Sequence, residues 1–154
     1  SYCREFPTHY VCGVGGGSGN ADSANPSPPA GNSRDARIKA AVVAAPALGF
    51  TFGARSLESI DIPVQLWRAE ADTVLPEPHY VEAVRRSMPK AEYRVVKGAG
   101  HYDFLAPCSA ALAAMARAIC DPTPGFDRTA FKGEFNREVV AFFRRALGGA
   151  AAAR

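Results

Sequence analysis

Two polar residues, Asp72 and His101, have the chemistry and the spacing of an acid–base pair. Asp72 follows the apolar segment 63–69, and His101 follows a second such segment, 93–96, and the small residues 98–100. Ligands of open parallel sheets bind beyond the carboxyl ends of the strands, where loops from neighbouring strands meet. A carboxylate that accepts a hydrogen bond from histidine fixes the ring tautomer and leaves Nε2 as a general base. Spacing alone leaves open the alternative of a surface aspartate and a structural loop histidine.

Asp103 is a second carboxylate near this histidine, two residues after it in the chain. A neighbour so close in sequence does not easily turn back to Nδ1 of His101, so we expect Asp72 to be the partner. The small residues 98–100 are expected to allow the sharp turn that presents the ring.

The elements that must position these residues alternate between strands and helices. Short apolar runs predict strands at 38–45, 63–69 and 93–96, the first typical of a strand buried on both faces of a parallel sheet. Helical spacing predicts helices at 80–88, 110–119 and about 129–147, the last capped by Asp127 and ended by Gly148-Gly149. This alternation predicts the α/β class, with a three-layer, doubly wound and mainly parallel sheet. Three strands are few for such a sheet, which suggests that part of the domain is missing.

Residues 1–36 differ in composition from the rest of the chain. They contain a glycine-rich stretch, 13–19, and a proline-rich stretch, 26–29, which leave no helical or strand period. We therefore expect an inserted lid or a linker at 1–36 and the main domain at 37–154.

The segment from about Asp35 to Leu147, about three quarters of the chain, resembles the C-terminal half of an α/β-hydrolase. It looks most like the predicted dienelactone-hydrolase-like branch, whose members resemble serine esterases. The motifs that carry the resemblance are Arg37-Ile38-Lys39-Ala40 leading into Ala45-Pro46-Ala47-Leu48-Gly49-Phe50, Pro63-Val64-Gln65-Leu66-Trp67, Asp72 with Pro76, Gly98-Ala99-Gly100-His101 leading into Asp103-Phe104-Leu105-Ala106-Pro107-Cys108, and Pro124-Gly125-Phe126-Asp127.

The resemblance implies a carboxylic-ester or lactone hydrolase with a small-molecule ester substrate and no cofactor. In the family's chain order of nucleophile, acid and histidine, Asp72 matches the acid and His101 the base. Phe50 and Phe52 could line the acyl pocket, or they could simply anchor their loop.

The nucleophile is where the sequence departs from the family. The elbow G-x-S-x-G should precede the acid within a strand–turn–helix unit. Ser18 comes near this motif, but Asn20 replaces its second glycine and no helix can follow. Cys12, a conceivable thiol nucleophile, lacks the same context. The oxyanion hole is expected to be absent with the elbow, so the chain alone is expected to be inactive.

Four cysteines fall into two close pairs, Cys3 with Cys12 and Cys108 with Cys120. Neither pair has the spacing of a zinc site or a redox motif, and no metal site is expected. The pairs predict two local disulfides, with four reduced buried thiols as the alternative. Disulfides and the resemblance together suggest a periplasmic or secreted protein. The sequence begins at Ser1 with no visible leader, as expected of a processed chain or of a fragment.

Charge and hydropathy exclude two kinds of partner. The chain has 18 basic and 15 acidic residues, a formal net charge of +3, and no basic block that would suggest nucleic acid. No apolar run reaches the ~18 residues of a membrane span. A half sheet would expose one strand edge, which predicts pairing with the missing N-terminal half of the domain or with a second chain. The alternative function is a non-catalytic binding or assembly module that retains the back half of the fold.

Overall fold

The computed structural model describes residues 35–47, 49 and 57–148, together with Arg4, Pro7 and Cys12. The chain divides into two compact units, 1–37 and 38–154, and every element described below belongs to the second unit. Most of the expected lid or linker at 1–36 lies outside the described residues. The same holds for Cys3, Ser18, Phe50 and Phe52.

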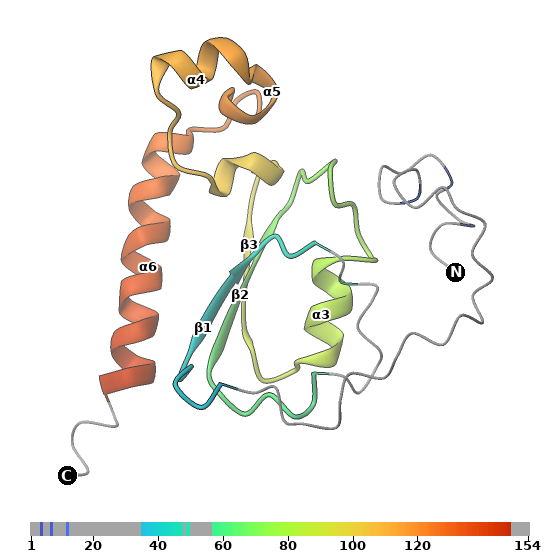
Figure 1. Cartoon of the computed structure of the whole chain (residues 1–154), viewed down its shortest axis with the longest axis vertical. Coiled ribbons are helices and arrows are strands. Elements are labelled where there is room, and N and C mark those ends of the chain that lie inside the picture. The colour runs from blue at the N-terminus through green and yellow to red at the C-terminus, as the bar shows by residue number, and fades with distance from the viewer. Residues whose placement is uncertain are drawn as a thin grey trace. The chain divides into compact units, whose positions relative to one another are not determined.

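A parallel sheet of three strands forms the centre of the second unit (Figure 1). Its order is β1 (Ala41–Ala44), β2 (Val64–Ala69) and β3 (Glu92–Val96). The central strand β2 is buried along its length except for the half-buried Arg68. The α/β class with a parallel sheet is therefore confirmed.

Strand β1 is less buried than the sequence predicts. All four of its residues are half-buried, whereas a strand buried on both faces was expected. The physical reason is that, within the described residues, β1 pairs with β2 and with no other strand. One edge of this short apolar strand is thus left without a strand partner in that part of the chain.

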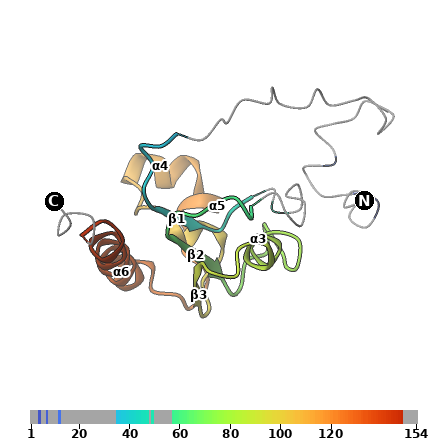
Figure 2. The same cartoon turned by 90° about the horizontal axis from the view of Figure 1, so that it is seen from below.

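Helices lie on the two opposite faces of the sheet (Figure 2). Alternate residues of β2 point to opposite faces. On one face, Leu66 packs with Val81 and Val84 of α3 (Val81–Ser87). On the other face, Trp67 meets Phe135 of α6 (Arg128–Gly148) edge to face, with ring centroids 4.9 Å apart.

Helix α6 also anchors the short 3₁₀ helix η2 (His101–Phe104). Phe104 makes edge-to-face contacts with Phe131 and Phe135 of α6, at centroid distances of 5.5 and 5.6 Å. The expected cap of α6 is present, because Asp127 Oδ1 accepts a hydrogen bond of 2.9 Å from the backbone N–H of Ala130. No helix in the described ranges is long and apolar enough to cross a membrane.

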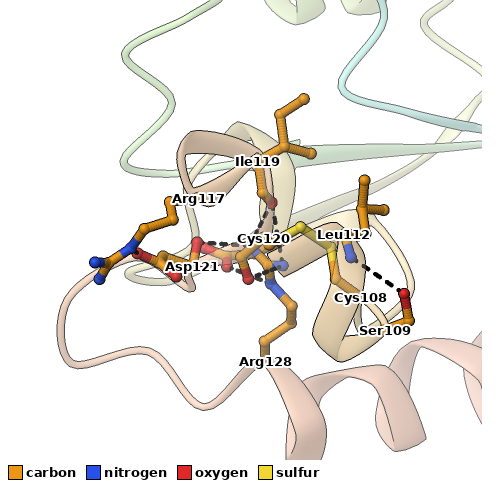
Figure 3. The surroundings of a disulfide bond; sticks show 9 residues. Cys108, Ser109, Leu112, Arg117, Ile119, Cys120, Asp121 and Arg128 are labelled. Atoms are coloured by element: carbon orange, nitrogen blue, oxygen red, sulfur yellow. Dashed lines mark hydrogen bonds and ion pairs between the residues drawn. A yellow bond between two sulfur atoms is a disulfide. The ribbon is translucent and has the colours of Figure 1, made fainter. Parts of the chain in front are cut away.

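The helix expected at 110–119 is instead two short helices, α4 (Ala110–Met115) and α5 (Arg117–Cys120), with a break at Ala116. Cys108 and Cys120 form a disulfide with their Cα atoms 5.6 Å apart (Figure 3). A continuous helix would separate two residues of this spacing by about 18 Å, since each residue rises about 1.5 Å. The cross-link therefore requires the chain to turn back between them.

Candidate functional site

The carboxylate of Asp72 and the imidazole of His101 are directly hydrogen bonded. Asp72 Oδ2 lies 2.9 Å from Nδ1 of His101, and the two side chains are 6% and 22% exposed. Backbone hydrogen bonds join the loops that carry them, from Ala71 N–H to the Ala99 carbonyl at 2.8 Å and from Glu70 N–H to the Val96 carbonyl at 3.0 Å. The two loops follow β2 and β3, so the pair lies at the carboxyl edge of the sheet.

A tight turn orients the Asp72 carboxylate. Its Oδ1 accepts hydrogen bonds from the backbone N–H groups of Val74 and Leu75, at 3.0 and 2.7 Å. The Leu75 side chain is almost completely buried and holds the turn against the core. Oδ1 is thus engaged by the backbone, and Oδ2 is directed to the histidine.

The hydrogen bond determines which nitrogen of His101 is available. An ionised carboxylate can only accept, so Nδ1 donates the proton and Nε2 keeps its lone pair. Within the described ranges, Nε2 has no hydrogen-bond partner. The ring meets Tyr102 edge to face at 5.0 Å. The arrangement leaves Nε2 able to take a proton from a reacting group.

Two glycines shape the turn before His101. Gly98 has φ +70°, which a side chain would disfavour, and its N–H donates to a carboxylate oxygen of Glu70 at 3.0 Å. Gly100 is extended, but a Cβ at this position would lie 2.3 Å from Oγ1 of Thr123. The expected need for small residues here thus has two causes, a positive φ at one position and a close approach at the other.

Asp103 faces away from His101. Its Oδ2 accepts a hydrogen bond of 2.8 Å from the N–H of Gly100, and its Oδ1 lies 3.0 Å from Nε of Arg128. The residue is completely buried. Burial acts to raise the pKa of this carboxyl group, but the hydrogen bonds from Thr123, Gly100 and Arg128 together lower the pKa below its usual value. Asp103 is therefore bound to the turn and to α6 rather than to the imidazole.

Arg128 is a residue that the sequence reasoning missed. Its side chain is only 6% exposed, and its two terminal nitrogens donate to the backbone carbonyls of Ile119, Cys120 and Asp121 at 2.8–3.3 Å (Figure 3). A sequence signal did exist, because a cation at the first position of a helix opposes the helix dipole. An arginine in that place needs compensating partners, which here are Asp103 and the three carbonyls.

A second polar cluster surrounds the start of α3. Burial raises the pKa of Glu77, whose Oε2 accepts a hydrogen bond of 3.0 Å from the N–H of Glu82. The hydroxyl of Tyr93 donates to Glu82 at 2.7 Å. Burial is the larger cause and this hydrogen bond the next, and together they raise the pKa of Tyr93 to about 12. These contacts hold α3 on its face of the sheet.

The described residues contain no group of three or more histidine, cysteine, aspartate or glutamate side chains arranged to hold a metal ion. Cys12 is disulfide-bonded, while Cys3, its expected partner, lies outside the described residues. Comparison of the chain with protein-family models, with curated proteins and with solved structures gave no match. Fold and site together define a parallel α/β protein with a partly buried carboxylate–imidazole pair at the carboxyl edge of its sheet.

Proposed function

We propose that this chain supplies the acid and the base of a Ser-His-Asp hydrolase that acts on carboxylic esters or lactones. The observation that carries the proposal is the 2.9 Å hydrogen bond from Nδ1 of His101 to Asp72, with Nε2 unpartnered in the described part of the chain. The order of Asp72 before His101, each in a loop after a parallel strand, also agrees with the resemblance to α/β-hydrolases of the dienelactone-hydrolase-like branch.

In this mechanism His101 moves protons between the nucleophile and the leaving group. Nε2 takes the proton of a serine hydroxyl as its oxygen attacks the ester carbonyl, and the imidazolium is stabilised by Asp72. His101 then protonates the departing alkoxide, which leaves an acyl-enzyme. Water, activated by Nε2 in turn, cleaves the acyl-enzyme and releases the acid. No cofactor is required for this chemistry.

We propose that the serine and the oxyanion hole come from a segment outside these 154 residues, either an upstream half of the same domain or a second chain. The edge of β1 that has no strand partner in the described residues supports this reading, because a further parallel strand could pair there. Ser18 is the competing candidate within the chain and lies outside the described residues.

The disulfide between Cys108 and Cys120 is compatible with an extracellular location. We propose a periplasmic or secreted protein on that basis together with the family resemblance. The substrate is proposed to be a small-molecule ester.

One observation favours the alternative of an assembly or binding module. Helices α4 and α5 bury no side chain, and Leu112, Met115 and Ile119 on them are 48%, 85% and 39% exposed. Exposed apolar side chains that lie near one another are typical of a surface that contacts another protein.

Labelling with a fluorophosphonate, read by intact mass, separates these possibilities. The 154-residue chain, the complete gene product and the His101→Ala variant of each are treated in parallel. An adduct on the complete product that is lost in the variant is the expected result. An adduct on the 154-residue chain would place the nucleophile inside it, with Ser18 the first candidate. A complete product that neither labels nor hydrolyses esters would favour the module.

A further inference from the structure

We propose that Asp103 and Arg128 form a buried positioning unit for His101, and that the Cys108–Cys120 disulfide holds the backbone carbonyls on which this unit depends. The effect on hydrolysis rests on the proposed function, because it requires His101 to be the base. The effect on the geometry of His101 does not.

The first link joins Asp103 to the turn before the histidine. Asp103 Oδ2 accepts the N–H of Gly100 at 2.8 Å, and Gly100 immediately precedes His101. Its other oxygen accepts the N–H of Thr123 at 3.3 Å. Oγ1 of the same Thr123 lies 2.3 Å from the position that a Cβ of Gly100 would take, so the turn has a hydrogen bond on one side and a close neighbour on the other.

The second link joins Asp103 to the loop that carries the disulfide. Arg128 donates from Nε to Asp103 and from its terminal nitrogens to the carbonyls of residues 119–121. All three guanidinium nitrogens of Arg128 therefore have hydrogen-bond acceptors, and the side chain is only 6% exposed. A buried charge tolerates few lost partners, so the position of residues 119–121 and the position of Asp103 are coupled through one side chain.

The third link is the disulfide itself. Neither α4 nor α5 buries a side chain, so packing contributes little to holding this loop in place. The disulfide closes a sequence separation of 12 residues and places Cys120, an acceptor of Arg128, beside Cys108. Cys108 is four residues from the end of η2 at Phe104, so the cross-link ties the acceptor carbonyls to the segment that begins with His101.

The loop also offers a matched control. Arg117 pairs with Asp121 at 3.1 Å, but these side chains are 79% and 54% exposed. Arg117 lies in α5 beside the acceptors of Arg128 and carries the same charge, and among the described residues it has no hydrogen bond or ion pair with the turn of His101. Its removal should leave the histidine unaffected.

The test measures the histidine directly by NMR of the imidazole nitrogens and the Nδ1 proton, assigned with His101→Ala. The variants of the full chain are Arg128→Met, Arg128→Lys, Asp103→Asn, the double variant Cys108→Ala/Cys120→Ala, and Arg117→Met as the control. Arg128→Met, Asp103→Asn and the cysteine double variant should exchange the Nδ1 proton about tenfold faster or more, because the turn that carries His101 opens more readily once its supports are removed. Arg117→Met should match the wild type, and Arg128→Lys, which keeps the charge and one contact, should fall between.

Wild-type protection of the Nδ1 proton in folded Arg128→Met would overturn the proposal. Should that variant not fold, wild-type protection of the Nδ1 proton in both Arg128→Lys and the cysteine double variant would overturn the proposal instead. Hydrolysis by the complete protein separates the two proposals. A lower kcat at unchanged KM, together with faster proton exchange, supports both. Faster exchange in a protein without any esterase activity retains the positioning unit and rejects the hydrolase.

Discussion

His101 and Asp103 are two residues apart in one 3₁₀ turn, yet their side chains enter opposite environments. His101 is 22% exposed and bonded to Asp72, whereas Asp103 is completely buried and bonded to Arg128. A turn this short can therefore present an imidazole on one side and anchor itself to the core on the other.

Asp72→Asn should leave the fold intact and lower kcat of the proposed complete hydrolase by about 10⁴. The amide can keep one oxygen on the backbone N–H groups of Val74 and Leu75, but its NH₂ group faces His101 and favours the wrong tautomer. Steady-state kinetics and the melting temperature are the measurements. Glu134→Gln, at an exposed carboxylate on α6, is the control and should change neither. Full activity in Asp72→Asn would reject the assigned acid.

Gly100→Ala should lower the free energy of unfolding by about 1–3 kcal/mol, the usual range for overpacking. The added Cβ would lie 2.3 Å from Thr123 Oγ1, so Thr123 or the turn must move. Chemical denaturation measures the change. Gly133→Ala on α6 is the control, since its Cβ would be 3.5 Å from a terminal nitrogen of Arg137, and it should stabilise by about 0.5–1 kcal/mol. Equal stability of Gly100→Ala and wild type would contradict the close approach.

Asp103 should contribute to acid sensitivity. The pKa of Asp103 is lower in the folded protein than the usual 3.8. Its contribution to the free energy of unfolding is therefore present above pH 3.8 and is lost as the pH falls through the lowered pKa. Asp103→Asn should cost about 3 kcal/mol at neutral pH, because it leaves Arg128 buried without a counter-charge. Urea denaturation across the acid range should show a shallower pH dependence for this variant. An unchanged slope would indicate that other carboxylates dominate.

Tyr93 should titrate at about 12, which the ultraviolet absorbance of its phenolate can follow. Because this pKa is raised from 10.0, protonated Tyr93 stabilises the folded protein fully below pH 10.0, and this stabilisation is lost as the pH rises toward 12. Tyr93→Phe should remove this alkaline loss and cost about 2 kcal/mol at neutral pH, the usual value for a hydrogen bond to a charged group. Glu82→Gln is the companion variant and should lower the pKa of Tyr93.

Sequence reasoning reached the strands, three of the helical regions and the hydrogen-bonded pair Asp72 and His101. The apolar run that becomes β2 and the polar Asp72 behind it are local features, and so is the Gly-Ala-Gly segment before His101. A parallel sheet brings loops after adjacent strands together whatever the details of packing. For that reason the meeting of Asp72 and His101 could be expected before any coordinates were known.

The break at Ala116, the burial of Arg128 and the buried partners of Asp103 could not be expected in the same way. Each depends on which distant groups meet: Cys120 with Cys108, Arg128 with the carbonyls of residues 119–121, and Asp103 with Thr123. An alanine-rich stretch favours one helix by propensity, whereas the cross-link between Cys108 and Cys120 requires the chain to turn back between them.

By itself, the sequence determined the parallel α/β class and placed Asp72 and His101 at one edge of the sheet, because hydrophobic periodicity and strand order are encoded locally. Only the tertiary structure decided that Asp103 is buried against Arg128 and what supports the turn that carries His101. The physical reason is that a buried charge must find its partners in three dimensions, and the partners of Asp103 and Arg128 come from segments that the sequence does not mark as neighbours.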